Sequence, residues 1–336
     1  MSYIYRMDKK PTVLITGANG FIGSRLCREF STRGFHIIAG VRPTANLELL
    51  NGVSIEYRYG DICDPATLID MVKHADYIIH NAGLVKAKED KTFFEVNERG
   101  TFNLLEAITQ HNPKVKNVIY LSSLAVAGPS IGGRPSKEND MPLPITTYGS
   151  SKLAAERVIA RYTDTLPILI IRPSGVYGPG DREILTIFQT VKCRIKPMFG
   201  DPERPIQLVH VDDLCRGVYL AAVSKAASGS VFFISENRAY TMSEMMSAIE
   251  TASGKNALKL PMPGWLFEGI AAISELGFRT VRATPMLTRE KANELLAPWS
   301  VSTDKARDVL GFESSIPFER GVKDTFDWYK ERGWIK

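Results

Sequence analysis

The sequence has few cysteines, no long uncharged apolar run and no apolar segment of a signal peptide in residues 1–10. No pair of cysteines has metal-ligand spacing, so we expect neither a disulfide framework nor a metal site. This usage fits a reducing compartment, and we expect a cytoplasmic protein. The longest apolar candidate, residues 265–278, is interrupted by Glu268 and Glu275, so no transmembrane segment is expected. The four cysteines are Cys27, Cys63, Cys193 and Cys215.

The chain also lacks a strongly basic or acidic stretch. Its formal net charge is +5, and the charges are interspersed, so we do not expect it to bind nucleic acid. The 336 residues, 44% of them hydrophobic and 24% charged, suffice for one large domain or two unequal lobes.

Short apolar strands alternate with helices in the first half of the chain. The strands are expected at Thr12–Thr16, His36–Val41, Ser54–Tyr59, Tyr77–His80, Asn117–Leu121 and Ile168–Arg172. The helices are expected at Ile22–Thr32, Pro65–Lys73, Thr92–Gln110 and Tyr148–Tyr162. This alternation predicts an α/β fold with a doubly wound parallel sheet.

Three glycines follow the first strand and open the first helix. In this position glycine lets the backbone approach a pyrophosphate, and the helix N-terminus offers free N–H groups. A glycine-rich turn without a ligand is the alternative, but the strand before and the helix after favour a dinucleotide site in a Rossmann fold. The residues expected at the cofactor are Gly17, Asn19, Gly20, Phe21, Ile22 and Gly23.

The pattern changes after Arg172, where a loop rich in proline and glycine begins. Strands are expected at Leu208–Val211 and Val231–Ile234, where the chain rejoins the first lobe. We therefore assign residues 1–178 and 206–236 to the dinucleotide-binding domain, and residues 179–205 and 237–336 to a smaller, discontinuous substrate lobe. Helices are expected at residues 183–191, 241–251, 261–298, 304–310 and 318–331.

The end of the second strand lies where dinucleotide folds read the ribose 2′ position. Here Arg42 stands at the strand end and no acid follows until Glu48, so we expect NADP(H) to be preferred, with NAD(H) as the alternative. Asp61 is expected to accept from the adenine amino group and Ile62 to pack on the ring. Asp61 as a helix cap is the other interpretation, although Asp64 is better placed for that. The small residues expected beside the ribose are Asn81, Ala82 and Gly83.

Tyr148 and Lys152 are separated by one helical turn and share a face. A cation beside the phenol is expected to lower its pKa, so that Tyr148 exchanges a proton with a substrate oxygen while hydride moves at a nicotinamide. A surface pair at helical spacing is the alternative. Ser122 and Ser123 end the fifth strand, and we expect one of them to hold the substrate oxygen and the other to cap or form a turn.

The chain resembles the extended short-chain dehydrogenase/reductases, in the NAD-dependent epimerase/dehydratase superfamily. The matching motifs occur in the family's order: Thr16–Gly23, Gly60–Asp61, Asn97, Leu121–Ser123, Tyr148–Lys152, Arg172–Asp181 and His210–Asp213. The resemblance implies that Ser123 holds the substrate, Tyr148 is the acid/base, Lys152 tunes it and Asn97 lies under the active site. It also implies that Pro173 and Val176 line the nicotinamide side, and Ser122 and Gly175 are expected among the other cofactor-binding residues.

Within the family, the chain is most similar to the dihydroflavonol reductase and 3β-hydroxysteroid dehydrogenase branch, which acts on relatively apolar substrates. Leu124 and Ala125 stand where dehydratases carry an acidic pair, which argues against dehydration. Ile206 stands where nucleotide-sugar epimerases usually place an arginine, although Arg204 is close enough to substitute.

We therefore expect an oxidoreductase that interconverts a secondary alcohol and a ketone on a small-molecule substrate, apolar or a sugar derivative. A sugar epimerase with tightly held NAD and a catalytically silent NADP(H) sensor are the alternatives. Many members of this family pair through two helices per subunit, so the resemblance implies a possible homodimer in which helices 92–110 and 148–162 form a four-helix bundle; packing of these helices within one chain is the alternative. Residues 262–283 offer an apolar stripe whose packing in the core is favoured over lining the substrate pocket; it comprises Met262, Trp265, Leu266, Phe267, Ile270 and Leu276.

Overall fold

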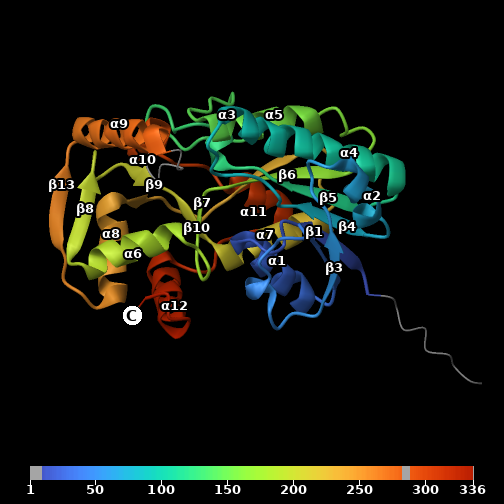
Figure 1. The fold of residues 1–336 in the computed structure, drawn as a ribbon, viewed down its shortest axis with the longest axis horizontal. Helices are drawn as coiled ribbons and strands as arrows, with labels where there is room; N and C mark the ends of the chain where they lie inside the picture. Colours follow the sequence, from blue (N-terminus) through green and yellow to red (C-terminus); the bar gives the residue numbers. More distant parts are fainter. Residues whose placement is uncertain (1–9, 282–287, 336) are drawn as a thin grey trace, which may run out of the picture.

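A seven-stranded sheet forms the larger part of the molecule, in the order β11-β6-β5-β4-β1-β2-β3, and every pairing in it is parallel. The computed structural model describes residues 10–281 and 288–335, with side chains described for residues 10–274 and 288–335. The doubly wound α/β fold predicted from the sequence is confirmed (Figure 1). The strands are β1 (Thr12–Thr16), β2 (His36–Val41), β3 (Ile55–Tyr59), β4 (Tyr77–His80), β5 (Asn117–Leu121), β6 (Ile168–Pro173) and β11 (Val231–Ile234).

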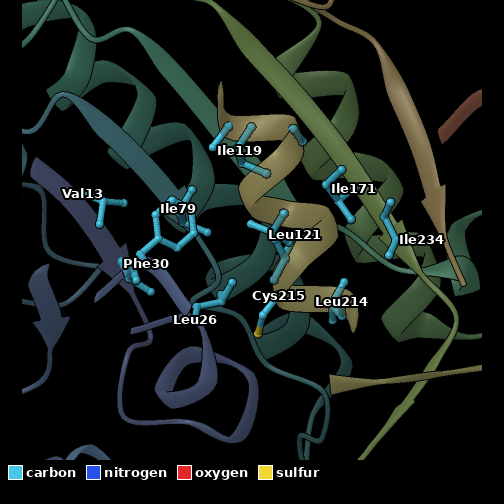
Figure 2. Packing of buried hydrophobic residues seen from close by; sticks show 14 of the residues in the cluster. Val13, Leu26, Phe30, Ile79, Ile119, Leu121, Ile171, Leu214, Cys215 and Ile234 are labelled. Atoms are coloured by element: carbon cyan, nitrogen blue, oxygen red, sulfur yellow. The ribbon is translucent and has the colours of Figure 1, made fainter. Parts of the chain in front are cut away.

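Helices cover both faces of this sheet because successive side chains of each strand point to opposite faces and are apolar on both. Val13 and Ile15 of β1 belong to one buried cluster, whereas Leu14 belongs to the other. Figure 2 shows Leu214 and Cys215 beside Leu121 in the first cluster. The first face is covered by α1 (Phe21–Thr32), α7 (Val211–Val223) and α11 (Asp304–Leu310), and the second by α2 (Pro65–Val72), α4 (Gly100–His111) and α5 (Thr147–Ile159).

The single helix predicted over 92–110 is interrupted. The chain forms α3 (Asp90–Phe93), a π-helical turn η2 (Phe94–Arg99) and then α4. A π-turn accommodates one extra residue and rotates the side chains that follow it. Two short 3₁₀ turns, η1 (Glu48–Leu50) and η3 (Leu124–Val126), follow β2 and β5.

A second lobe packs around its own buried cluster, at the left of Figure 1. Its helices are α6 (Glu183–Lys192), α8 (Met242–Ser253), α9 (Gly264–Val281), α10 (Arg289–Leu296) and α12 (Phe318–Glu331). Two small sheets pair β8 (Ile195–Phe199) with β13 (Leu258–Met262) and β9 (Pro205–Ile206) with β12 (Tyr240–Thr241). The sequence analysis predicted none of these four strands.

One further expectation needs correction, and one expected strand has a partner that the sequence did not suggest. The strand β10 (Leu208–His210) does not join the large sheet, because it pairs with β7 (Gly175–Tyr177) in a separate ribbon. The segment 261–298 is not continuously helical, since it begins in β13 and then divides into α9 and α10; residues 282–287 lie outside the described part. Among the described helices, none has the length and apolar character needed to cross a bilayer.

The sequence analysis favoured packing of the apolar stripe of α9 in the core. The structure shows instead that most of this stripe is exposed. Phe267 faces inward and stacks on Phe199 with 4.6 Å between ring centroids. Trp265, Leu266 and Ile270 face outward and are 73%, 40% and 41% exposed. The side chain of Leu276 lies outside the described residues.

Two glycines give a matched test of this packing. An alanine Cβ at Gly23 would lie 2.1 Å from the Gly17 carbonyl oxygen, whereas one at Gly269 in α9 would meet nothing within 4 Å. We expect Gly23→Ala to lower the free energy of unfolding by about 1–3 kcal/mol through overpacking. Gly269→Ala is expected to raise it by about 0.5–1 kcal/mol through helix propensity. Urea titration measures both changes in the free energy of unfolding. An unchanged value in Gly23→Ala would contradict the overpacking expected between the glycine loop and α1.

Candidate active site

The glycine loop after β1 leaves the N-terminus of α1 open. Gly17 has φ +65°, and a Cβ there would lie 2.9 Å from the Cα of Ala82. Gly20 is the N-cap, with no side-chain capping bond, and the first turn of α1 carries no acid. A Cβ on Gly20 would meet only the Gly17 carbonyl, at 3.4 Å. The helix dipole and its N–H groups therefore fit the pyrophosphate of a dinucleotide.

The segment after β4 packs directly against this loop. The Asn81 side chain donates to the Gly17 carbonyl at 3.2 Å, and the Ala82 N–H donates to Thr16 Oγ1 at 3.1 Å. A Cβ on Gly83 would lie 3.0 Å from Asn97 Oδ1 and 3.1 Å from Lys152 Nζ. The structure therefore brings these predicted residues together, and glycine is needed where the chain passes Lys152.

Arg42 follows β2, the strand that pairs with β1, and is exposed. Burial raises the pKa of Cys63, in the loop after β3. The charge of Arg42 acts to lower this pKa, so Arg42 lies close enough to influence that loop. Asp61 accepts from the Cys63 N–H at 2.9 Å, and Asp64 caps α2 as the sequence suggested. Ile62 is only 8% exposed, so the predicted packing on adenine can involve only this small exposed part of its side chain.

The remaining residues expected at the cofactor lie on adjoining segments. Asn19, Phe21 and Ile22 are half-buried in the glycine loop and the first turn of α1. Pro173 ends β6 and is buried, while Gly175 and Val176 belong to β7. β6 lies next to β5 in the sheet, so Pro173 ends the strand that neighbours the one before Ser122.

The two serines after β5 have different surroundings. The Ser122 hydroxyl donates to Glu156 at 2.5 Å, and the carboxylate of Glu156 also accepts two bonds from Arg172, at 2.9 and 2.6 Å. The hydroxyl proton of Ser122 is therefore engaged by Glu156, and Ser122 is 4% exposed. Ser123 caps η3 by accepting from the Ala125 N–H at 3.1 Å, and its hydroxyl is close enough to the Tyr148 phenol to act on the pKa of that phenol.

Lys152 is the buried cation of the site. Its ammonium donates to the Leu121 carbonyl at 2.8 Å and lies 4.7 Å from the centroid of the Tyr120 ring. Burial lowers the pKa of Lys152 to about 8, while the charge of Glu156 acts to raise it. Thr146 caps α5 by accepting from the Gly149 N–H, so the helix that carries Tyr148 and Lys152 begins at a fixed residue.

The expected lowering of the Tyr148 pKa by Lys152 is wrong. Burial raises the pKa of Tyr148 to about 12; the nearby Ser123 hydroxyl acts to lower this pKa, and the charges of Glu294 and Glu183 act to raise it further. The ammonium of Lys152 bonds instead to the end of β5. Desolvation therefore outweighs the attraction that the sequence spacing suggested.

Asn97 lies at the centre of a buried hydrogen-bond network. Its side chain accepts from the Leu84 N–H at 2.8 Å and donates to the Leu84 carbonyl at 3.0 Å and to Ser151 at 2.9 Å. Ser151 in turn donates to the Tyr148 carbonyl at 2.7 Å. The π-turn η2 positions Asn97 for these contacts, which connect the end of β4 to α5.

Several polar residues near the site escaped the sequence analysis. The ring of His80 bridges Thr16 and Thr101 at 2.9 and 3.0 Å. Glu156 lies four residues after Lys152 on the same helix, and this spacing could have predicted that the two side chains share a face. The second lobe reaches the site through Glu290, which accepts from the N–H and hydroxyl of Thr147 at 3.0 and 2.8 Å. No group of three metal-ligating side chains is found in the described part of the chain.

The buried His80 generates a pH prediction. Burial lowers its pKa from 6.5 to about 3, so the unfolded chain takes up the proton first as the pH falls. Stability from neutral His80 is therefore present above pH 6.5 and lost between pH 6.5 and 3. We expect His80→Gln, which still bridges two hydroxyls, to reduce the loss of unfolding free energy between pH 7 and 4.5 by roughly 1–3 kcal/mol. The exposed His111→Gln is the control, and an unchanged loss in His80→Gln would contradict the assignment.

Comparison with known proteins agrees with this geometry. The model of the NAD dependent epimerase/dehydratase family matches residues 13–235. The chain is similar to a ceramide reductase of Caulobacter vibrioides, with 30% identity over 98% of this chain and 97% of the relative. It is also similar to a UDP-glucose 4-epimerase of Vibrio cholerae, with 28% identity over 94% of each chain.

Among solved structures, the fold is similar to that of gox2253. The TM-score is 0.82 at 26% identity, and the match covers 97% of this chain and all of that chain. These matches extend over the sheet, the glycine loop and the second lobe. The chain therefore belongs to the NAD dependent epimerase/dehydratase family and is an extended short-chain dehydrogenase/reductase.

Proposed function

We propose that this protein is an NADP(H)-preferring reductase that converts a ketone on an apolar substrate into a secondary alcohol. The observation that carries the proposal is the placement of Ser123, at the end of β5, close to the Tyr148 phenol, with the buried ammonium of Lys152 on the same helix as Tyr148 and bonded to the Leu121 carbonyl. The similarity to a ceramide reductase supports an apolar substrate. The assignment of residues 179–205 and 237–336 to a substrate lobe is part of this proposal.

Each residue has one task in the proposed reaction. When bound, the nicotinamide supplies a hydride to the carbonyl carbon. The Ser123 hydroxyl orients the carbonyl oxygen, and Tyr148 donates its phenolic proton to that oxygen. Lys152 would supply positive charge to the bound cofactor and the reacting oxygen, and Asn97 holds the backbone between β4 and α5.

The protonation state of Tyr148 favours reduction over oxidation. With a pKa of about 12, the phenol is neutral near pH 7 and is the proton donor that a reductase needs. Oxidation of an alcohol would require the phenolate as a base. Lys152, with a pKa of about 8, is mostly cationic at the same pH.

A UDP-sugar epimerase is the second candidate, and Arg204 is the observation that favours it. Arg204 is 4% exposed, and its Nε and Nη2 have no hydrogen-bond partner within the described structure. A buried guanidinium with two free donors is suited to an anionic substrate group. Its Nη1 is bound to the carbonyls of Phe199 and Asp201 at 2.6 and 2.7 Å.

Pairing of two copies and a cytoplasmic location remain predictions. An apolar hollow of about 620 Å³ lies along the outer side of α5 and η2, where a second copy is expected to pack. Its lining residues include Phe94, Leu153 and Ala154.

The Tyr148→Phe variant tests the reductase directly. We expect it to bind NADPH with unchanged affinity and to lose at least about 100-fold in kcat with long-chain ketones, because the proton donor is gone. Absorbance loss of NADPH measures turnover, and Tyr57→Phe on the surface is the control.

Wild-type conversion of a UDP-hexose without net cofactor change would favour the epimerase. NADPH binding with no turnover on any carbonyl would favour a sensor.

The Arg42→Ser variant tests the cofactor preference. We expect the Kd for NADPH to rise by roughly 10–100-fold, since a charge-assisted contact with the 2′-phosphate is lost, while the Kd for NADH stays within about twofold. Titration of intrinsic fluorescence measures both, with the exposed Arg161→Ser as control. Equal weakening of both cofactors would contradict the role given to Arg42.

A further inference from the structure

A small pocket lies on the far side of the sheet from α5. Its volume is about 260 Å³, and it is lined by Arg25 and Arg28 of α1 and by Arg332, which follows α12. α1 packs in the first buried cluster of the sheet and α5 in the second, so the sheet separates this pocket from the helix that carries Tyr148 and Lys152. We call it the arginine pocket.

The arginine pocket is also separate from the proposed cofactor site. Arg28 lies eight residues after Gly20, which is about 12 Å along the axis of α1 from the end proposed to hold the pyrophosphate. The described lining of the pocket includes none of the residues expected at the cofactor, from the glycine loop to Val176. Binding of a dinucleotide therefore does not account for these arginines.

The guanidinium of Arg28 is held by backbone carbonyls and keeps donors for a ligand. Its Nη2 donates to the carbonyls of Leu49 and Asn51, at 3.0 and 2.9 Å. Within the described residues, its Nε and Nη1 form no hydrogen bond and no carboxylate is paired with it. A guanidinium held in this way loses little side-chain freedom when an anion binds.

Two other guanidiniums reach the pocket, and they differ in their partners. Arg25 is paired with Asp212 through contacts of 2.8 and 2.5 Å, which offset its charge. Arg332 is exposed and lies over the Trp328 ring, 5.7 Å from the centroid. Among the residues that the structure describes, Arg332 has no carboxylate partner. Its guanidinium is therefore available to a ligand.

The arginine pocket carries more positive than negative charge. Glu48 is the one acidic side chain in its described lining, against three guanidiniums, of which one is paired with Asp212. Burial lowers the pKa of Arg28, and the charges of Arg25 and Arg332 lower it further, so the three cations lie within range of one another. This repulsion is relieved when an anion lies between the cations.

We propose that the arginine pocket binds a phosphate group, either inorganic phosphate or a small phosphomonoester, between Arg28 and Arg332. Guanidinium N–H groups match the oxygens of phosphate. The two arginines approach from α1 and from the end of α12, and a tetrahedral anion directs oxygens toward both, whereas a planar carboxylate presents only two. The anion would join the larger lobe, through α1, to the second lobe, through α12 (Figure 1).

The size of the arginine pocket favours a small ligand. Its volume of about 260 Å³ is several times the roughly 30 Å³ of one water molecule. It lies below the roughly 300–1,000 Å³ of pockets that take drug-sized ligands. Phosphate, or a phosphomonoester of a few carbon atoms, fits this range, and a dinucleotide does not.

Isothermal titration calorimetry with inorganic phosphate, at an ionic strength held constant with sodium chloride, tests the proposal without substrate or cofactor. We expect saturable binding with a Kd of roughly 1 mM or lower. Arg332→Ser is expected to raise this Kd by about 10-fold and Arg28→Ser/Arg332→Ser by about 100-fold, because each substitution removes a charge-assisted contact. Arg332→Ser leaves the bonds of Arg28 to the loop after β2 in place, so its effect is separable from a loss of folding.

A substitution of opposite sign provides a second measurement. Glu48→Gln is expected to lower the Kd for phosphate by about 3-fold, because it removes a repelling carboxylate, and a damaged fold would not tighten binding. The matched control is Arg161→Ser/Arg320→Ser, which removes two exposed cations elsewhere and should leave the Kd unchanged. Tighter binding of glycerol 3-phosphate than of phosphate would support an organic phosphate as the ligand, and the reverse order would support the free ion.

Three outcomes would overturn the proposal. The first is the absence of saturable phosphate binding, and the second is equal weakening by the control pair. The third is binding that NADPH abolishes and that Arg28→Ser/Arg332→Ser leaves unchanged, which would place the phosphate at the glycine loop. The phosphate titration needs no turnover, so its failure is distinguishable from a failure of the proposed reductase.

Discussion

The hydrogen bond from the Lys152 ammonium to the Leu121 carbonyl is the contact on which the site depends. It joins α5, on one face of the sheet, to the carboxyl end of β5. Once that contact is made, helical geometry places Tyr148 one turn earlier, beside Ser123. Gly83 must lack a side chain because the chain after β4 passes within contact distance of the same ammonium.

Burial governs the charges of this site more than pairwise attraction does. It raises the pKa of Tyr148 and lowers that of Lys152, so both groups are pushed toward their neutral forms. Glu156 and Arg172 form a buried ion pair, in which their side chains are 7% and 4% exposed. The charge of Glu156 opposes the lowering of the Lys152 pKa by burial. A site arranged in this way holds a neutral donor beside a cation near neutral pH, which suits reduction.

The sequence predicted the parts of the fold that depend on local pattern. The six strands of the first half and their helices follow from apolar periodicity, and the glycine loop follows from the close approach of backbones at Gly23. It did not predict the π-turn before Asn97, because one extra residue leaves the apolar period almost unchanged. Nor did it predict the direction of the Tyr148 pKa shift, which depends on burial of the phenol rather than on its spacing from Lys152.

The second lobe shows why a hydrophobic pattern does not by itself locate a core. The stripe on α9 has helical spacing, and the sequence analysis therefore favoured burial. The helix instead buries Phe267 and Ala271 and turns Trp265 and Ile270 outward. Periodicity states that residues share a face, but only the neighbouring elements decide which face is covered. Here β8 and α10 cover one side of α9, and the opposite side retains its apolar character, which a purely aqueous surface does not require.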